Sequence, residues 1–205
     1  MSAPDRDLRV LFFGDSFVAG TGDPTGCGWV GRVVAATWAA GTPMTAYPLG
    51  IRRETSVEVA ARWRAEMRPR LLAGADCRVV FSFGTNDATF EDGRARVEPQ
   101  ASVLMLERVL DEAARLGLTA FVVGPAPSCD PGQDDRVSAL SARFATVCAA
   151  RSVPFVEVIE ALRATAAWAE EAQAGDGVHP AAGGYEALTA LVLAGGWLGW
   201  VGSRA

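Results

Sequence analysis

Residues 10–17 read V-L-F-F-G-D-S-F, an apolar run that stops at a glycine, an aspartate and a serine. The continuous apolar run from Val10 to Phe13 is typical of a strand that is buried on both faces of a parallel sheet. Ser16 follows the carboxyl end of this strand, which is the edge where open α/β sheets bind ligands. We therefore expect a site at Ser16, with the serine as nucleophile if the chain also supplies a base and oxyanion donors.

The same alternation of apolar strand and helical segment continues along the chain. Further strands are expected at 43–49, 78–83, 120–123 and 154–158, and helices at 29–40, from a cap at Thr55 or Ser56 to Pro69, from Pro99 to Gly117, at 136–150 and at 185–197. This pattern predicts an α/β fold in three layers, α/β/α, around a five-stranded parallel sheet. No linker or repeat interrupts it, so residues 1–205 are expected to form a single domain.

The composition narrows the class of protein. Half of the residues are apolar and 21% are charged, as in soluble globular proteins, and the net charge of −5 argues against a nucleic-acid partner. All 19 basic residues are arginine, which excludes a phosphate-loop lysine and a serine–lysine dyad. The four widely spaced cysteines indicate reduced thiols, not a zinc site or a disulfide framework.

The chain shows no targeting signal and no membrane-spanning segment. Only seven polar or small residues precede Leu8, so no secretory signal is expected and the cytoplasm is the expected location unless a leader has been removed. The apolar stretch 187–200 is broken by Thr189 and by glycines, and it is too short to span a bilayer. Stable membrane insertion is therefore not expected.

A base for Ser16 can come from one residue only. His179 is the single histidine of the chain, and its unperturbed side chain titrates near neutral pH. Asp176, three residues earlier, can accept a hydrogen bond from Nδ1 and leave Nε2 facing Ser16. The expected catalytic residues are therefore Ser16, His179 and Asp176.

Donors for an oxyanion are expected at three successive strand ends. They are the backbone N–H groups of Ser16 and Gly50 and the side-chain amide of Asn86, with glycine at 50 allowing close approach of the oxygen. Asp15, Arg52, Arg53 and Asp87 are further candidates for substrate contact. For Asp87 we favour a structural role that braces its loop, and the two arginines fit either a solvated face or recognition of a carboxylate or phosphate.

Taken together, these residues resemble the SGNH or GDSL hydrolases. The resemblance covers nearly the whole chain and rests on Gly14-Asp15-Ser16, on Gly50, on Gly84-Thr85-Asn86-Asp87 and on Asp176 to His179, in the family's order. It implies a flavodoxin-like sheet and ester hydrolysis through an acyl-serine intermediate, without cofactor or metal. Two positions depart from the family: Phe17 stands where leucine is frequent, and Arg53 replaces a second glycine.

The expected function is hydrolysis of small or short-acyl esters, because the chain has no inserted lid to enclose a long lipid tail. An acyltransferase or thioesterase would use the same residues, and a catalytically idle binding module would keep the same fold. A nucleotide-binding flavodoxin-like protein is disfavoured, because residues 18–28 lack the G-x-G-x-x-G pattern at a helix entry. The acyl chain and the oligomeric state stay open.

Overall fold

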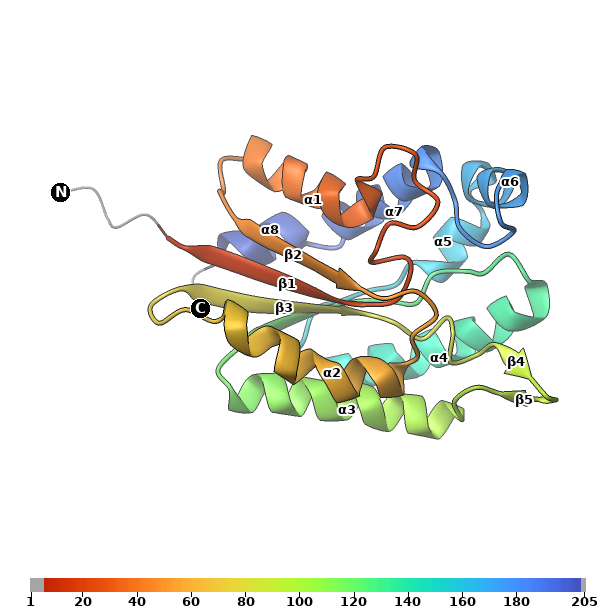
Figure 1. Ribbon diagram of the computed structural model, residues 1–205, viewed down its shortest axis with the longest axis horizontal. Coiled ribbons are helices and arrows are strands. Elements are labelled where there is room, and N and C mark those ends of the chain that lie inside the picture. The colour runs from red at the N-terminus through yellow and green to blue at the C-terminus, as the bar shows by residue number, and fades with distance from the viewer. Residues whose placement is uncertain (1–5, 204–205) are drawn as a thin grey trace.

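A computed structural model of the protein describes residues 6–203. Its main sheet has five parallel strands in the order β2-β1-β3-β6-β7 (Figure 1). The strands are β1 (Leu8–Gly14), β2 (Thr45–Gly50), β3 (Asp76–Ser82), β6 (Thr119–Val123) and β7 (Phe155–Val156). Each strand lies within a predicted segment or extends it by one or two residues, except the last, which is shorter, so the three-layer flavodoxin-like prediction is confirmed.

Helices cover both faces of this sheet (Figure 1). On one face lie α1 (Gly28–Ala39), α5 (Ile159–Arg163), α6 (Ala166–Ala174), α7 (Ala182–Ala194) and α8 (Trp197–Gly202). On the other lie α2 (Ser56–Met67), followed by the short 3-10 helix η1 (Arg68–Arg70), α3 (Pro99–Arg115) and α4 (Pro131–Ala150). The smaller hairpin of β4 (Phe90–Glu91) and β5 (Arg94–Ala95) projects between β3 and α3.

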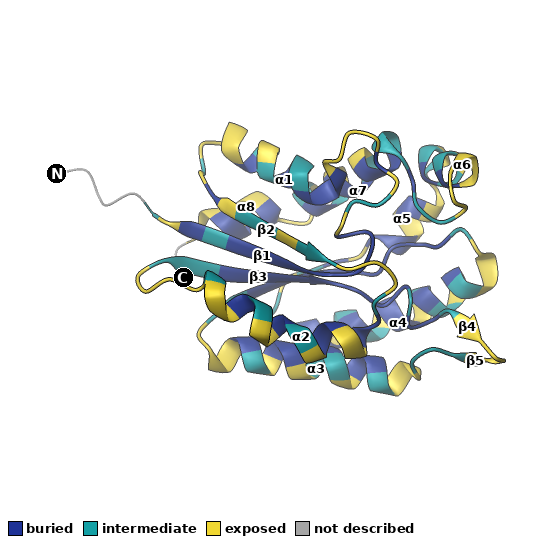
Figure 2. Ribbon diagram, in the orientation of Figure 1, coloured by how far each residue is buried: buried dark blue, intermediate teal, exposed yellow. Residues whose placement is uncertain are grey.

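The central strand β1 shows why the sheet is buried on both sides. Val10 and Phe12 pack with α1, α7 and α8, whereas Leu11 and Phe13 pack with α2 and α3, and all four are 0% exposed. Figure 2 shows the same pattern, with the central strands buried and the outer faces of the helices exposed. The uninterrupted apolar run is thus explained by two helical layers, one on each face.

Several boundaries differ from the expected ones, for local reasons. Helix α4 begins at Pro131 instead of residue 136, because Asp130 accepts a hydrogen bond from the Gln133 N–H at 2.6 Å and caps the helix. Helix α7 begins at Ala182 and ends at Ala194 instead of spanning 185–197. The hairpin β4–β5 and helices α5, α6 and α8 were not predicted.

A buried arginine attaches the C-terminal segment to the sheet. Arg78 of β3 is 0% exposed, and it binds the Asp76 carboxylate and the carbonyl oxygens of Trp200 and Ser203. Its guanidinium also lies 5.2 Å from the centre of a Trp200 ring. Arg6 donates to the carbonyls of Val201 and Ser203 at 2.6 and 2.7 Å, so the two ends of the described chain meet here.

None of the helices formed by residues 6–203 combines the length and the apolar character needed to cross a membrane.

Candidate active site

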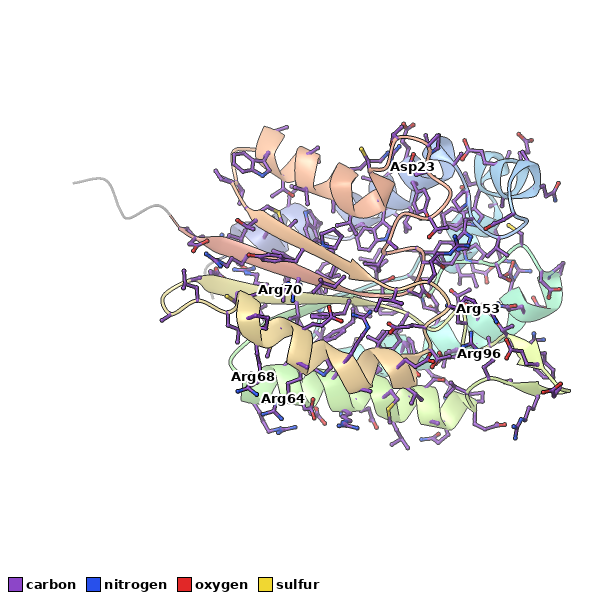
Figure 3. All side chains as sticks on the ribbon, viewed as in Figure 1. Asp23, Arg53, Arg64, Arg68, Arg70 and Arg96 are labelled. Carbon is purple, nitrogen blue, oxygen red and sulfur yellow. The ribbon has the colours of Figure 1, made fainter. Side chains whose placement is uncertain are left out.

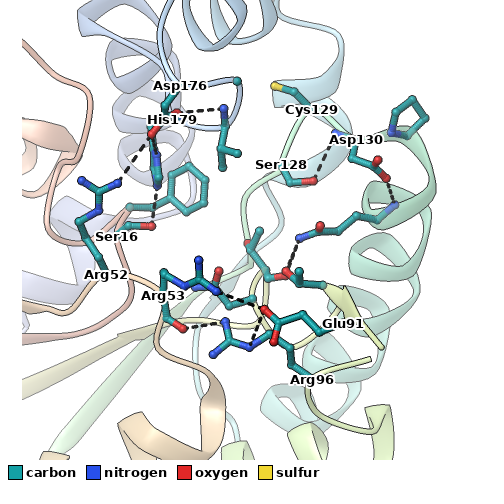
Figure 4. A pocket seen from close by; sticks show the side chains of 18 residues that line it. Ser16, Arg52, Arg53, Glu91, Arg96, Ser128, Cys129, Asp130, Asp176 and His179 are labelled. Carbon is teal, nitrogen blue, oxygen red and sulfur yellow. Dashed lines mark hydrogen bonds and ion pairs between the residues drawn. The ribbon is translucent and has the colours of Figure 1, made fainter. Parts of the chain in front are cut away.

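The three residues expected to react lie together at the carboxyl edge of the sheet. Ser16 follows β1, and His179 lies in the loop before α7. The Ser16 Oγ is 2.7 Å from His179 Nε2, and His179 Nδ1 is 2.7 Å from an Asp176 carboxylate oxygen (Figure 4). Ser16 and His179 are 163 residues apart in the sequence, and the packing of α7 beside α1 brings them together. The distances suit proton transfer from the serine to the imidazole.

The loop around Asp176 fixes the orientation of its carboxylate. One oxygen accepts the backbone N–H groups of Val178 and His179 at 3.0 and 2.9 Å, and the other faces the His179 ring. Partial burial acts to raise the pKa of Asp176, but these hydrogen bonds and the nearby imidazole outweigh burial and lower the pKa to about 2. Asp176 is therefore ionised at every pH at which the protein is expected to work.

Packing holds the His179 ring in place. Phe17 lies between two rings, with its centroid 5.2 Å from that of His179 and 5.6 Å from that of the buried Trp168. On the other side Gly22 has φ +90°, and a Cβ there would come within 2.9 Å of the His179 Cβ and 2.7 Å of the Pro180 carbonyl oxygen. Only glycine allows this loop to contact the histidine so closely.

Asp15 and Asp87 lie beneath the site and not in it. They are 2% and 0% exposed, and neither lines the pocket, so the structure does not support the expectation that they contact substrate. Asp15 accepts the Phe17 N–H at 3.0 Å, and Asp87 accepts the Ser56 N–H at 2.7 Å. The bracing role that the sequence favoured for Asp87 agrees with this contact.

Burial changes the charge of these two carboxyls. It raises the pKa of Asp15 to about 7, against the hydrogen bond from Phe17 and with help from the nearby charges of Asp87 and Glu54. Burial also raises the pKa of Asp87, although the Ser56 N–H donates to it. One Asp87 oxygen is buried without a hydrogen-bond partner among the described residues. Carboxyls in such surroundings favour the neutral form.

Of the expected oxyanion donors, Ser16 and Asn86 line the pocket and Gly50 does not. The Asn86 amide donates one hydrogen to the Glu54 carbonyl at 2.9 Å, which leaves its second hydrogen available. Gly50 lies against the turn that carries Ser16, where a Cβ would come within 2.3 Å of the Ala19 nitrogen. Gly50 therefore packs closely against this turn, and its N–H stays a predicted oxyanion donor.

Arg62 ties the strand ends together and was not identified from the sequence. Its guanidinium donates to the carbonyls of Gly14 and Leu49 at 3.1 and 2.8 Å, and its Nε donates to Glu54 at 2.8 and 2.7 Å. The ends of β1 and β2 and the following loop are thus held by one side chain. A lone arginine in an amphipathic helix gives no sequence signal of such a role.

The site opens into a pocket of about 510 Å³. Among its lining residues are Arg52, Arg53, Glu91 and Arg96, and the backbone of Arg53 has φ +67°. For a residue with a Cβ this left-handed conformation costs about 1 kcal/mol. Arg96, just after the hairpin, donates to the Arg53 carbonyl at 2.9 Å and thereby supports the turn. Hairpin residues were not expected at the site, because β4 and β5 are only two residues long each.

The described residues contain no cluster of three or more histidine, cysteine, aspartate or glutamate side chains that could hold a metal ion. Cys129 lines the pocket, but burial raises the pKa of its thiol. The arrangement of Ser16, His179 and Asp176 is thus the part of the site suited to nucleophilic chemistry.

Comparison with known proteins agrees with this geometry. The sequence profile of the GDSL-like lipase/acylhydrolase family matches residues 12–187. A search of curated proteins found no match.

Solved structures with the same fold share little sequence with the chain. A lipase/acylhydrolase from Enterococcus faecalis superposes with a TM-score of 0.77 at 24% identity, covering 97% of this chain and 99% of that one. An acetylxylan esterase from Geobacillus stearothermophilus gives 0.74 at 19% identity, covering 98% of both chains. A GDSL-like lipase from Bacteroides thetaiotaomicron gives 0.67 at 20% identity, covering 91% and 86%.

Proposed function

The chain belongs to the GDSL-like lipase/acylhydrolase family and is a carboxylic ester hydrolase, and we propose that it works through an acyl-serine intermediate on esters with a short acyl group. Ser16 is the nucleophile, His179 the general base and acid, and Asp176 the residue that orients His179. The proposal treats residues 1–205 as one catalytic domain acting on a small-molecule ester.

In the first half of the reaction, the Ser16 oxygen attacks the ester carbonyl carbon while its proton passes to His179 Nε2. The carbonyl oxygen becomes an oxyanion, which the Ser16 N–H and the Asn86 amide stabilise. The carbon–oxygen bond to the alcohol then breaks, and His179 returns the proton to the departing alcohol. The acyl group remains on Ser16.

In the second half, water attacks the acyl-serine and gives its proton to His179. The second tetrahedral intermediate collapses, the bond to Ser16 breaks, and the serine recovers its proton from His179. Asp176 remains ionised throughout, since its pKa is about 2, and it stabilises the imidazolium that forms in each half.

The observation that carries the proposal is the pair of 2.7 Å contacts on either side of the His179 ring. Nδ1 facing a carboxylate must carry the ring hydrogen, which leaves the lone pair of Nε2 for the serine. Neither a binding module nor a structural loop needs this arrangement.

The pocket supports a short acyl group. Its volume is about 510 Å³, and most of the residues that line it are polar or charged, with Phe17, Pro131 and Val178 among the apolar ones. A long acyl chain would have to lie against charged groups, which costs solvation energy. The fold similarity to an acetylxylan esterase agrees with an acetyl-sized acyl group.

Initial rates on p-nitrophenyl esters from acetate to palmitate test the proposal, with Ser16→Ala as the control. We expect rates that are highest for the shortest chains and that vanish in the variant. Mass spectrometry after treatment with a phosphonate probe should find the adduct on Ser16. A folded protein that hydrolyses no ester and forms no adduct would refute the proposed function.

A further inference from the structure

Two arginines stand at the entrance to the pocket beside Ser16. Arg52 and Arg53 both line it, and their side chains are 63% and 78% exposed. Figure 3 shows Arg53 and Arg96 at the site end of the molecule, whereas Arg64, Arg68 and Arg70 lie toward the opposite end. In a chain whose net charge is −5, guanidinium groups are thus gathered where the substrate enters.

The hydrogen-bonding capacity of these two guanidinium groups is largely unused. Arg53 donates to Glu91 at 3.2 Å, and Arg52 approaches Asp176 no closer than 3.8 Å (Figure 4). A guanidinium has five N–H donors. Each arginine can therefore still bind an incoming anion with two parallel hydrogen bonds.

The carboxylates of the pocket are already occupied. Asp176 accepts two backbone N–H groups and faces His179, and Asp130 caps α4. Glu91 is shared, since it lies 3.2 Å from Arg53 and 3.8 Å from Arg96. These acids have partners that remain during catalysis, whereas the two exposed arginines have donors left over.

The backbone at Arg53 is strained, because a residue with a Cβ is held there in the left-handed region at φ +67°. The Arg96 side chain, only 17% exposed, donates to the Arg53 carbonyl and thereby links the turn to the β4–β5 hairpin. Glycine would satisfy this turn without strain. An arginine held in this conformation at the mouth of the pocket is positioned to contact what binds there.

We infer that Arg52 and Arg53 select esters that carry an oxyanionic group, a carboxylate or a phosphate, next to the ester bond. This inference rests on the proposed function, because it names the substrate class of the same site. The anion lies between the two guanidinium groups and helps to position the ester carbonyl at Ser16.

Matched acetate esters that differ only in charge provide the test. The anionic probe is 4-acetoxybenzoate, the neutral one is 4-acetoxybenzamide, and 4-acetoxyphenyl phosphate examines the second anion. Each kcat/KM is divided by the rate of hydrolysis by hydroxide, which removes differences in leaving group. We expect the anionic probes to be preferred by about tenfold, as for charge-assisted hydrogen bonds at a partly exposed site.

Substitutions of the arginines and of Glu91 should change the preference for anionic probes in opposite directions. Arg52→Gln and Arg53→Gln should each lower it by about fivefold, and Glu91→Gln should raise it by releasing Arg53. Arg94→Gln removes the same charge from the neighbouring β4–β5 hairpin, outside the catalytic pocket, so it should change the preference by less than about twofold. Added salt should weaken the preference of the wild type.

Binding measurements test this inference independently of the proposed function. Calorimetry on Ser16→Ala measures the affinity for each intact probe without turnover, with and without Arg53→Gln. If the wild type hydrolyses nothing, the proposed function fails, and these affinities still decide the inference. Equal affinities for anionic and neutral probes, or a preference that survives both arginine substitutions, would overturn it.

Discussion

Replacing Asp15 with asparagine should make the protein more stable at neutral pH than the wild type. Asp15 is 2% exposed and its pKa is raised to about 7, whereas an exposed aspartate ionises near 3.8. Between these two values the folded state holds a proton that the unfolded state has lost. Stability therefore falls as pH rises, by about 1.4 kcal/mol for each pH unit, or about 4 kcal/mol across the window from pH 4 to pH 7.

Asparagine removes this penalty and keeps the structural contact. Its side-chain oxygen still accepts the Phe17 N–H, and it has no proton to exchange. The free energies of unfolding of Asp15→Asn and of the wild type should therefore differ by a constant amount below pH 4. By pH 7 the free energy of unfolding of the variant should have risen by up to about 4 kcal/mol relative to that of the wild type. Asp87, whose pKa is also raised, leaves some of the slope in both proteins.

Urea unfolding at half-unit steps from pH 4 to pH 7.5 measures this difference. The control is Asp92→Asn, which makes the same chemical change at an exposed position in the β4–β5 turn. Its stability curve should run parallel to that of the wild type. Parallel curves for Asp15→Asn as well would show that the buried carboxyl is not protonated in the folded protein and would refute the reasoning.

Four other changes have expected outcomes. Ser16→Ala and His179→Ala should each lower kcat by about 10⁴-fold with unchanged circular dichroism, and the double variant should lose little more. Ionisation of Asp176 should give no step above pH 4 in the pH profile of kcat/KM for a short ester, because the pKa of Asp176 is about 2; a step there that Asp176→Asn abolishes would contradict this assignment. Gly22→Ala should lower kcat by at least about tenfold by displacing His179, and it should also lower the thermal midpoint because alanine is strained at φ +90°; initial rates measured well below that midpoint check the loss of kcat. Arg78→Met should cost about 3 kcal/mol in urea unfolding, because the Asp76 carboxylate and the carbonyls of Trp200 and Ser203 each lose one of their donors; an unchanged free energy of unfolding would contradict this.

The strands could be predicted because burial on both faces leaves a simple mark. The runs at 10–13 and 79–81 are continuous and apolar, and each lies in a strand with helices above and below it. Helix faces were harder to predict, since α2 buries Val59 and Met67 but leaves Val57 45% exposed and Ala61 exposed. The two-residue strands β4 and β5 are too short for any periodic pattern to appear.

At the site, the sequence predicted which residues lie close together but not which residues surround them. Ser16, His179 and Asp176 meet because parallel strands bring their carboxyl ends to one edge. Asp15 and Asp87 are buried because each carboxylate binds a backbone N–H of its surroundings, that of Phe17 and that of Ser56. The contacts of Arg62 and Arg96 depend on tertiary packing, and no spacing in the sequence encodes them.

The contact of Arg6 with the carbonyls of Val201 and Ser203 has a consequence for the connectivity of the chain. Because these ends meet at the edge of the sheet opposite the pocket, a short peptide joining them would circularise the fold without crossing the catalytic edge (Figure 1). New termini could then be opened at Gly74, an exposed glycine with nothing within 4 Å of its missing side chain. The order of the strands along the chain would change while their order in the sheet, and the meeting of serine and histidine, would stay the same.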